Sequence, residues 1–188
     1  MEIISGEFVM RGCDRSEALC SIEDAAALIH QIGFLPLFSN DIAGFSLEEH
    51  VPADVWWTGD THADPWEWRM MLAEDPSIAY GIFFNRTAGF VSKDFFPVFA
   101  NYRRNGYDFD ALFDDELASY RSKKIMDVFN EDPELLTYQI KELAGFGKRT
   151  EDGQAAEKNF EGCLTELQMQ TYLIISGFHQ KKNKKGAP

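Results

Sequence analysis

The last third of the chain constrains the fold most, because its helix and strand signals follow one another at short, regular intervals. A first helix is predicted from Ser122, and Asp132-Pro133-Glu134 has the pattern of a second helix start. Gly145-Phe146-Gly147 ends that helix, and an amphipathic third helix follows. Met169 to Ile175 is rich in β-branched and aromatic residues, which predicts a strand.

Three helices followed by a strand are the element order of a winged-helix module. Lysines and one asparagine at 181–185 then have the composition of a hairpin tip, and the sequence ends shortly afterwards. We therefore expect the strand at 170–175 to lack its wing partner. Another strand of the chain or a second copy would cover its edge, and we predict a homodimer through this strand.

The first half of the chain combines helix starts with one hairpin. Ser21-Ile22-Glu23-Asp24 is a capping-box pattern, and Asp64-Pro65 is a second helix start. Residues 34–38 form an apolar connector, in which Pro36 disfavours a central strand. Two runs within 77–92 flank a polar turn and predict a β-hairpin. The fold class is α+β, mostly helical, with winged-helix-like modules and short antiparallel hairpins.

The domain organisation predicted for residues 1–188 is a single compact α+β domain. The alternative is two lobes: a helix and hairpin lobe at 21–105, and a winged-helix-like lobe with an incomplete wing at 106–188. A length of 188 residues with 45% hydrophobic residues is sufficient for a substantial core in either arrangement.

A net charge of −13 weighs against strong nucleic-acid binding, because cationic side chains supply most of the affinity for phosphate. Any binding to DNA would need a local basic face. The candidate nucleic-acid-binding residues are Lys148, Arg149, Lys181, Lys182, Lys184 and Lys185, with Arg103-Arg104 as a further basic pair. A solvated loop end is the competing interpretation of the lysine cluster. We expect weak DNA binding or a protein partner.

The centre of the chain holds the densest chemistry, because all four tryptophans lie between Trp56 and Trp68. Indole faces near an arginine can stack on a planar ligand, or they can pin a long loop to the core. The candidate ligand-binding residues are Trp66, Trp68, Arg69, Tyr80, Gln168 and Gln170. Asp60, His62 and Asp64 are spaced as weak metal ligands, but N-capping accounts for Asp64, so we expect no metal and no cofactor.

Known catalytic motifs for phosphate, dinucleotide, serine-hydrolase and zinc-protease chemistry are missing from the sequence, and no catalytic residue is assigned. No apolar run is long enough for a membrane-spanning helix, so no membrane partner is expected. Cys13, Cys20 and Cys163 lack metal-type spacing and are interpreted as reduced thiols of a cytoplasmic protein.

Several stretches together resemble the AlkZ-related proteins, distant relatives of the winged-helix DNA glycosylases that unhook interstrand crosslinks. The stretches are Trp66 to Arg69, Ile78 to Phe84, Ala88 to Lys93 and Leu167 to Leu173. The resemblance implies that a Gln-apolar-Gln or Gln-apolar-Asp motif would follow the first helix and activate water. This sequence has Pro36-Leu37-Phe38 there, and neither Pro36 nor Phe38 can orient water. Gln168-Met169-Gln170 has matching letters on the predicted strand, where Gln168 and Gln170 would share one face.

Two functions follow as hypotheses. The first is a non-catalytic winged-helix-like protein that binds a nucleic-acid or protein partner. The alternative is an altered or vestigial DNA glycosylase-like enzyme, or a small-molecule binder, that uses the tryptophan-rich centre. Whether the chain is an enzyme is left open, with the missing glutamine motif favouring no.

Overall fold

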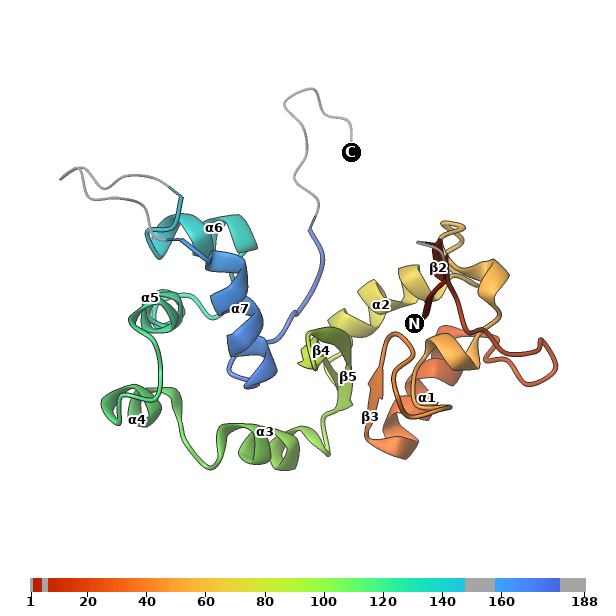
Figure 1. The fold of residues 1–188 in the computed structure, drawn as a ribbon, viewed down its shortest axis with the longest axis horizontal. Coiled ribbons are helices and arrows are strands. Elements are labelled where there is room, and N and C mark those ends of the chain that lie inside the picture. The colour runs from red at the N-terminus through yellow and green to blue at the C-terminus, as the bar shows by residue number, and fades with distance from the viewer. Residues whose placement is uncertain (1, 5–6, 148–157, 180–188) are drawn as a thin grey trace, which may run out of the picture. The chain divides into compact units, whose positions relative to one another are not determined.

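The computed structural model describes residues 2–4, 7–147 and 158–179 (Figure 1). The chain divides into two compact units, one formed by residues 1–99 with 174–178 and the other by residues 100–173 with 179–188. Helices and a small antiparallel sheet make the fold α+β, as the sequence predicts.

The first unit contains the strands and the first two helices. These are β1 (Glu2–Ile4), β2 (Glu7–Val9), α1 (Ile22–Ile32), β3 (Phe34–Pro36), α2 (Pro65–Glu74), β4 (Ile78–Phe84) and β5 (Thr87–Ser92), with 3-10 turns at Glu48–His50 and Ala53–Val55. The second unit contains α4 (Phe109–Asp114), α5 (Tyr120–Val128), α6 (Thr137–Leu143) and α7 (Phe160–Met169). Helix α3 (Phe96–Arg104) contributes residues to both units.

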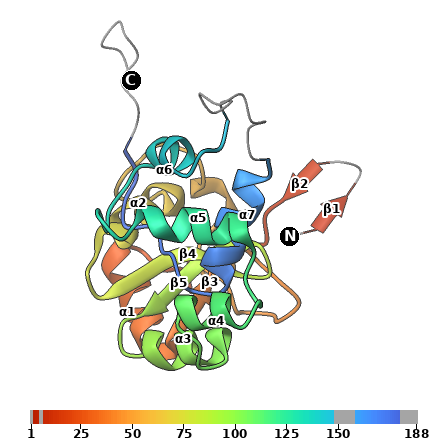
Figure 2. The same ribbon diagram turned by 90° about the vertical axis from the view of Figure 1, so that its left-hand side faces the viewer.

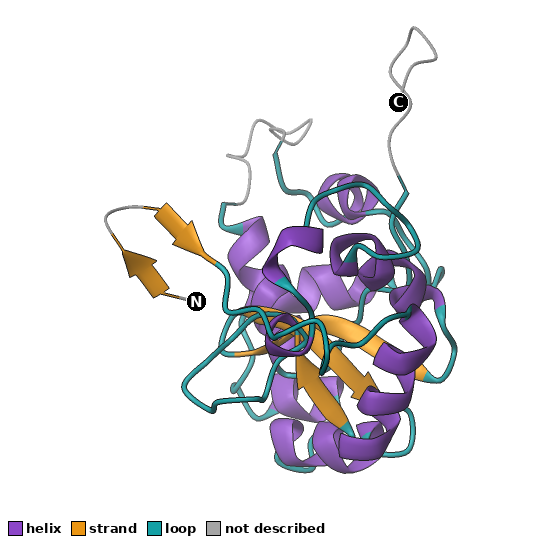
Figure 3. Ribbon diagram, turned by 90° about the vertical axis from the view of Figure 1, so that its right-hand side faces the viewer, coloured by secondary structure: helices purple, strands orange, loops and turns teal. Residues whose placement is uncertain are grey.

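The predicted hairpin is confirmed as β4 and β5, which belong to a three-stranded antiparallel sheet of order β3-β5-β4 (Figures 2 and 3). Asn85 and Arg86 form its two-residue turn, and both have positive φ, as the turns that match strand twist require. The apolar connector prediction is wrong in part, because Phe34–Pro36 pairs with β5 as an edge strand. Pro36 is tolerated there because an edge strand needs fewer backbone donors.

Helix α1 begins where the capping pattern places it. The Ser21 hydroxyl accepts a hydrogen bond from the Asp24 amide, and Gly33 ends the helix with φ of 88°. Ala25 and Ile29 are fully buried in the core of the first unit, with Leu35 of β3 and Phe90 of β5. The apolar stripe of α1 therefore covers the small sheet.

A fully buried carboxylate fixes the loops around this core. Glu48 accepts hydrogen bonds from the backbone amides of Arg11, at 2.7 Å, and of Ser39, at 2.8 Å. The two amides are far apart in the sequence, so one side chain ties the N-terminal segment and the loop after β3 to the same turn. Charged acceptors of backbone amides are among the stronger hydrogen bonds in proteins.

The second unit has a core of its own, formed by Ile125, Phe146, Phe160 and Leu167 among others. Helix α6 ends as predicted: Gly145 has φ of 79°, and the amides of Gly145 and Phe146 donate back to the carbonyls of Glu142 and Lys141. This pair of hydrogen bonds is a Schellman motif.

The starts of three helices in the second unit differ from their predictions. Helix α6 begins at Thr137, because Asp132 uses its carboxylate in a local turn with the Glu134 amide. Helix α5 begins at Tyr120, because Ser119 is its cap and Ser122 lies within the helix. Helix α7 begins at Phe160, and the first part of its predicted stripe lies outside the described residues.

The predicted strand at 170–175 is wrong. Helix α7 continues to Met169 and ends in a second Schellman motif, with Thr171 in the left-handed position at φ of 66°. The Arg104 guanidinium bonds to the Thr171 carbonyl and hydroxyl, which stabilises this unusual backbone for a β-branched residue. Only Ile175 makes a ladder contact, a bridge to Tyr80 of β4. A homodimer through this segment therefore loses its structural basis.

Within the described part of the chain, helices are too short and too polar to cross a bilayer.

The two hydrogen bonds that Glu48 accepts from the Arg11 and Ser39 amides, which we call the Glu48 clamp, give a stability prediction. Replacing Glu48 with Gln keeps the shape but turns an amide group toward one backbone N–H, so that one buried pair becomes two facing donors. We expect the free energy of unfolding to fall by about 2 kcal/mol in urea denaturation. Glu23→Gln, an exposed position on α1, is the matched control and should leave it nearly unchanged. Equal effects at both positions would contradict the clamp.

Candidate functional site

An arginine stacked between two aromatic rings forms the centre of the candidate site in the first unit. Trp66 and Arg69 are three residues apart on α2, so they project from the same helix face. The Arg69 guanidinium carbon lies 3.7 Å from the centre of the Trp66 ring and 4.5 Å from that of Phe178. Both distances are within the range of cation–π attraction.

The aromatic surface continues from Trp66 into the loops. The Phe38 ring lies 6.4 Å from Trp66 and 5.6 Å from Trp56, measured between ring centres. Trp57 lies 5.9 Å from Trp56 and 6.4 Å from Trp66, so the rings form a closed group. We call Phe38, Trp56, Trp57, Trp66 and Arg69 the tryptophan cluster.

Trp57 is the exposed member of this cluster. Half of its side chain is accessible to solvent, whereas Trp56 is 5% exposed. Its backbone has φ of 58°, a left-handed conformation that is rare for a bulky residue. Strained backbone of this kind costs on the order of 1–3 kcal/mol and is concentrated at functional positions. Here the strain presents an indole ring to solvent beside Trp66.

Two buried donors in the cluster have no acceptor among the residues that the structure describes. They are the Trp56 indole N–H and the Nε–H of Arg69. Buried indole and guanidinium groups normally find hydrogen-bond partners. The cluster therefore combines ring faces and donors without matching acceptors, which is suited to a ligand or partner group rich in acceptor oxygens.

Tyr80 of β4 lies next to Phe178 and Arg69. Its ring centre is 5.8 Å from that of Phe178 and 5.0 Å from that of Phe90. Burial raises the pKa of the Tyr80 hydroxyl above its ordinary value, and the neighbouring Arg69 guanidinium opposes this shift. Tyr80 is therefore a neutral, buried support for Arg69 at physiological pH.

The structure brings together three of the residues singled out from the sequence, namely Trp66, Arg69 and Tyr80. Trp68 lies in the core instead, 1% exposed, with its indole N–H donating to the His62 carbonyl at 3.2 Å. Sequence reasoning did not single out Phe38 or Phe178 as members. Phe178 is more than a hundred residues from Arg69, and no local pattern connects them.

Gln168 and Gln170 belong to the second unit and do not share a strand face, contrary to the prediction. Gln168 is buried in α7, and Gln170 is the residue that follows the helix. Residues two apart in a helix point in nearly opposite directions, so the pair does not line one groove.

The basic candidates are largely outside the described residues: Lys148, Arg149, Lys181, Lys182, Lys184 and Lys185 all lie there. Of the Arg103-Arg104 pair, Arg104 is engaged with Thr171 and stacks over the Tyr172 ring at 4.7 Å. The Arg104 side chain therefore stabilises the C-terminal end of α7.

The acidic residues before α2 hold the loop through hydrogen bonds to backbone amides. Asp64 is fully buried and accepts hydrogen bonds from the amides of Gly59 and Trp66, and Asp60 accepts one from the His62 amide. No group of three metal-ligating side chains is formed by the described residues.

The positions at which the resemblance implies a polar pair are apolar and packed. Pro36 is buried in β3, and Phe38 belongs to the tryptophan cluster. The tryptophan cluster thus includes one of the two positions at which the related glycosylases would carry a water-activating side chain.

The raised pKa of Tyr80 gives a pH prediction. The unfolded chain ionises this tyrosine near pH 10, whereas the folded chain keeps it neutral to higher pH. Its contribution to stability is complete below about pH 10 and is lost as the pH rises through the folded pKa. Urea midpoints measured at about pH 8 and 11 should differ less in Tyr80→Phe than in the wild type. Tyr102→Phe, an exposed control, should keep the wild-type difference. An unchanged difference in Tyr80→Phe would contradict this assignment.

Comparison with known protein families confirms the resemblance found in the sequence. The model of the family described as AlkZ related matches residues 19–188. Searches of curated proteins and of solved structures gave no match. Since the match extends over most of the sequence, the chain belongs to the AlkZ-related family.

Proposed function

We propose that this AlkZ-related protein is a non-catalytic binding protein that holds a protein partner through its tryptophan cluster. The observation that carries the proposal is Trp57, a half-exposed indole in strained backbone beside the Trp66–Arg69 stack. Tryptophan and arginine are the residue types most enriched among the energetically dominant contacts of protein interfaces.

A binding role is favoured over catalysis by the residues at positions 36 and 38. A proline and a phenylalanine carry no group that can accept or donate the proton of an attacking water. The acidic side chains of this region, Asp64 and Glu48, accept backbone hydrogen bonds and are fully buried. They are positioned as structural acceptors rather than as general bases.

A protein partner is favoured over nucleic acid by charge. The net charge of −13 repels phosphate at long range. Arg69 is covered by two rings and Arg104 is bonded to Thr171, so neither presents a free fork to a phosphate. A winged-helix-like use of the second unit against DNA depends on basic residues outside the described part of the chain. A cytoplasmic location is part of the same proposal and is supported by three free cysteines.

A second candidate function is an altered glycosylase or small-molecule binder at the same cluster. The unpaired donors of Trp56 and Arg69 are the specific observation in its favour, because a planar ligand with acceptor atoms would match them.

A substitution at Trp57 distinguishes an effect on partner binding from an effect on folding stability. Trp57→Gly removes the ring but relieves the left-handed backbone, so we expect the free energy of unfolding to stay within about 1 kcal/mol of the wild type. The partner is first captured from a cell extract with immobilised wild-type protein and then purified. Its binding to the wild type and to Trp57→Gly is measured by calorimetry. The dissociation constant should rise at least about thirtyfold, the effect of losing a dominant interface tryptophan. Ile42→Ala, exposed in the same unit, should bind as the wild type does. A partner that is a nucleic acid, or one that binds Trp57→Gly equally well, would refute the proposal.

Nucleic-acid binding and base release distinguish the alternative. Fluorescence anisotropy with duplex DNA should show weak binding at low salt that is lost at physiological salt and falls further in a Lys182→Glu, Lys185→Glu variant. Incubation with alkylated or crosslinked DNA should release no base above background. Release that is lost in Trp57→Gly would instead establish the glycosylase-like function.

A further inference from the structure

An open pocket of about 500 Å³ lies in the second unit, separate from the tryptophan cluster. It is formed where α5 and α6 end, by residues from Lys124 to Glu131 on one side and by Leu143 to Gly145 on the other. A volume of this size accommodates a small ligand or a long side chain.

The charges in the pocket favour a cation. Among the described residues, Asp127 and Glu131 line it together with Lys124, whose ammonium lies 5.1 Å from the centre of the Tyr120 ring. Glu131 is exposed and forms no hydrogen bond or ion pair with any residue that the structure describes. The carboxyl ends of two helices add negative partial charge at the same place.

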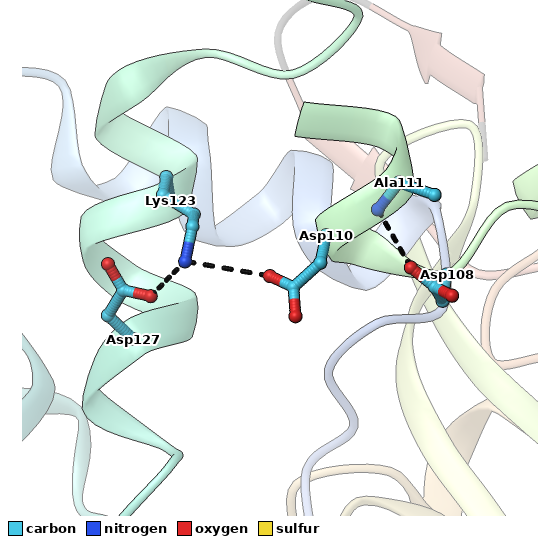
Figure 4. A network of polar contacts seen from close by, with 5 residues as sticks. All are labelled: Asp108, Asp110, Ala111, Lys123 and Asp127. Carbon is cyan, nitrogen blue, oxygen red and sulfur yellow. Dashed lines mark hydrogen bonds and ion pairs between the residues drawn. The ribbon is translucent and has the colours of Figure 1, made fainter. Parts of the chain in front are cut away.

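Lys123, which precedes Lys124 on α5, is already paired. Lys123 forms ion pairs with Asp127 on its own helix and with Asp110 of α4 at 3.5 Å (Figure 4). The hydrogen bond to Asp127 raises the pKa of Lys123, as these acidic neighbours stabilise its charged form. Figure 4 also shows Asp108 capping α4 through the Ala111 amide, so Asp108 has a local role. Lys123 therefore does not neutralise Glu131.

The remaining wall of the pocket is apolar. Val128 and Ala144 line it, and Leu143 lines it while leaving 65% of its side chain exposed. An exposed leucine next to an unpaired carboxylate matches a partner group with a cationic head and an apolar neighbourhood. A phosphate would face Asp127 and Glu131, and a free amine would leave the Leu143 side chain uncovered.

We propose that this pocket binds a lysine or arginine side chain carried by an apolar stretch of a partner protein. The cationic head lies against Glu131 and Asp127, its methylene stem packs on Val128, and a flanking apolar residue covers Leu143. The pocket lies within the second unit and shares no residue with the tryptophan cluster.

The test uses the full ¹⁵N-labelled chain and three capped peptides: Gly-Leu-Lys-Leu-Gly, the same peptide with Glu for Lys, and Gly-Gly-Lys-Gly-Gly. The first peptide should shift the backbone amide resonances of residues 127–131 and 143–145, with saturation at millimolar concentrations. The other two should bind at least about threefold more weakly.

Variants assign the contacts. Glu131→Lys should weaken the first peptide about tenfold and Leu143→Ala about threefold, whereas Glu116→Gln, an exposed charge outside the pocket, should have no effect. Circular dichroism checks that each variant is folded. Shifts confined to other residues, equal binding of the glutamate peptide, or wild-type binding by Glu131→Lys would each overturn the proposal. Equal shifts with butylamine would assign the pocket to a free amine and overturn it as well.

Discussion

The first unit depends on the return of residues 174–178 to the helix and strand that the chain formed much earlier. The Ile175 amide donates to the Tyr80 carbonyl at 2.7 Å, and the Phe178 ring packs on both Tyr80 and Arg69. Without this segment Arg69 would stack on one ring instead of two, and the buried face of Tyr80 would be open to water.

Two arginines of this chain hold its structure together. Arg69 is stacked between rings, and Arg104 secures the end of α7 through Thr171. In both cases the contacts of the guanidinium group reduce the positive charge available at the surface of an already acidic protein. The two candidate surfaces, one aromatic and one acidic with an exposed leucine, consequently favour protein chemistry over phosphate chemistry.

Left-handed backbone at two bulky residues has two different explanations. At Thr171 the strain is compensated locally, because Arg104 bonds to its carbonyl and hydroxyl and the position ends a helix. At Trp57 the left-handed backbone leads to a half-exposed indole beside Trp66. Strained backbone that exposes a large apolar side chain is better explained by binding than by folding.

The sequence by itself determined the elements whose signals are local: the helix start at Ser21, the cap at Asp64, the hairpin, and the end of α6 at Gly145. It also indicated that indole rings of the tryptophan-rich centre would lie near Arg69, as Trp66 does. Only the tertiary structure decided the rest. Residues 169–175 have strand composition, yet α7 and Arg104 turn them into a helix end, because hydrogen bonds from Arg104 outweigh β propensity at Thr171. The packing of Phe178 on Arg69 could not be predicted from local patterns either, because contacts between residues distant in the chain leave no periodic signal in the sequence.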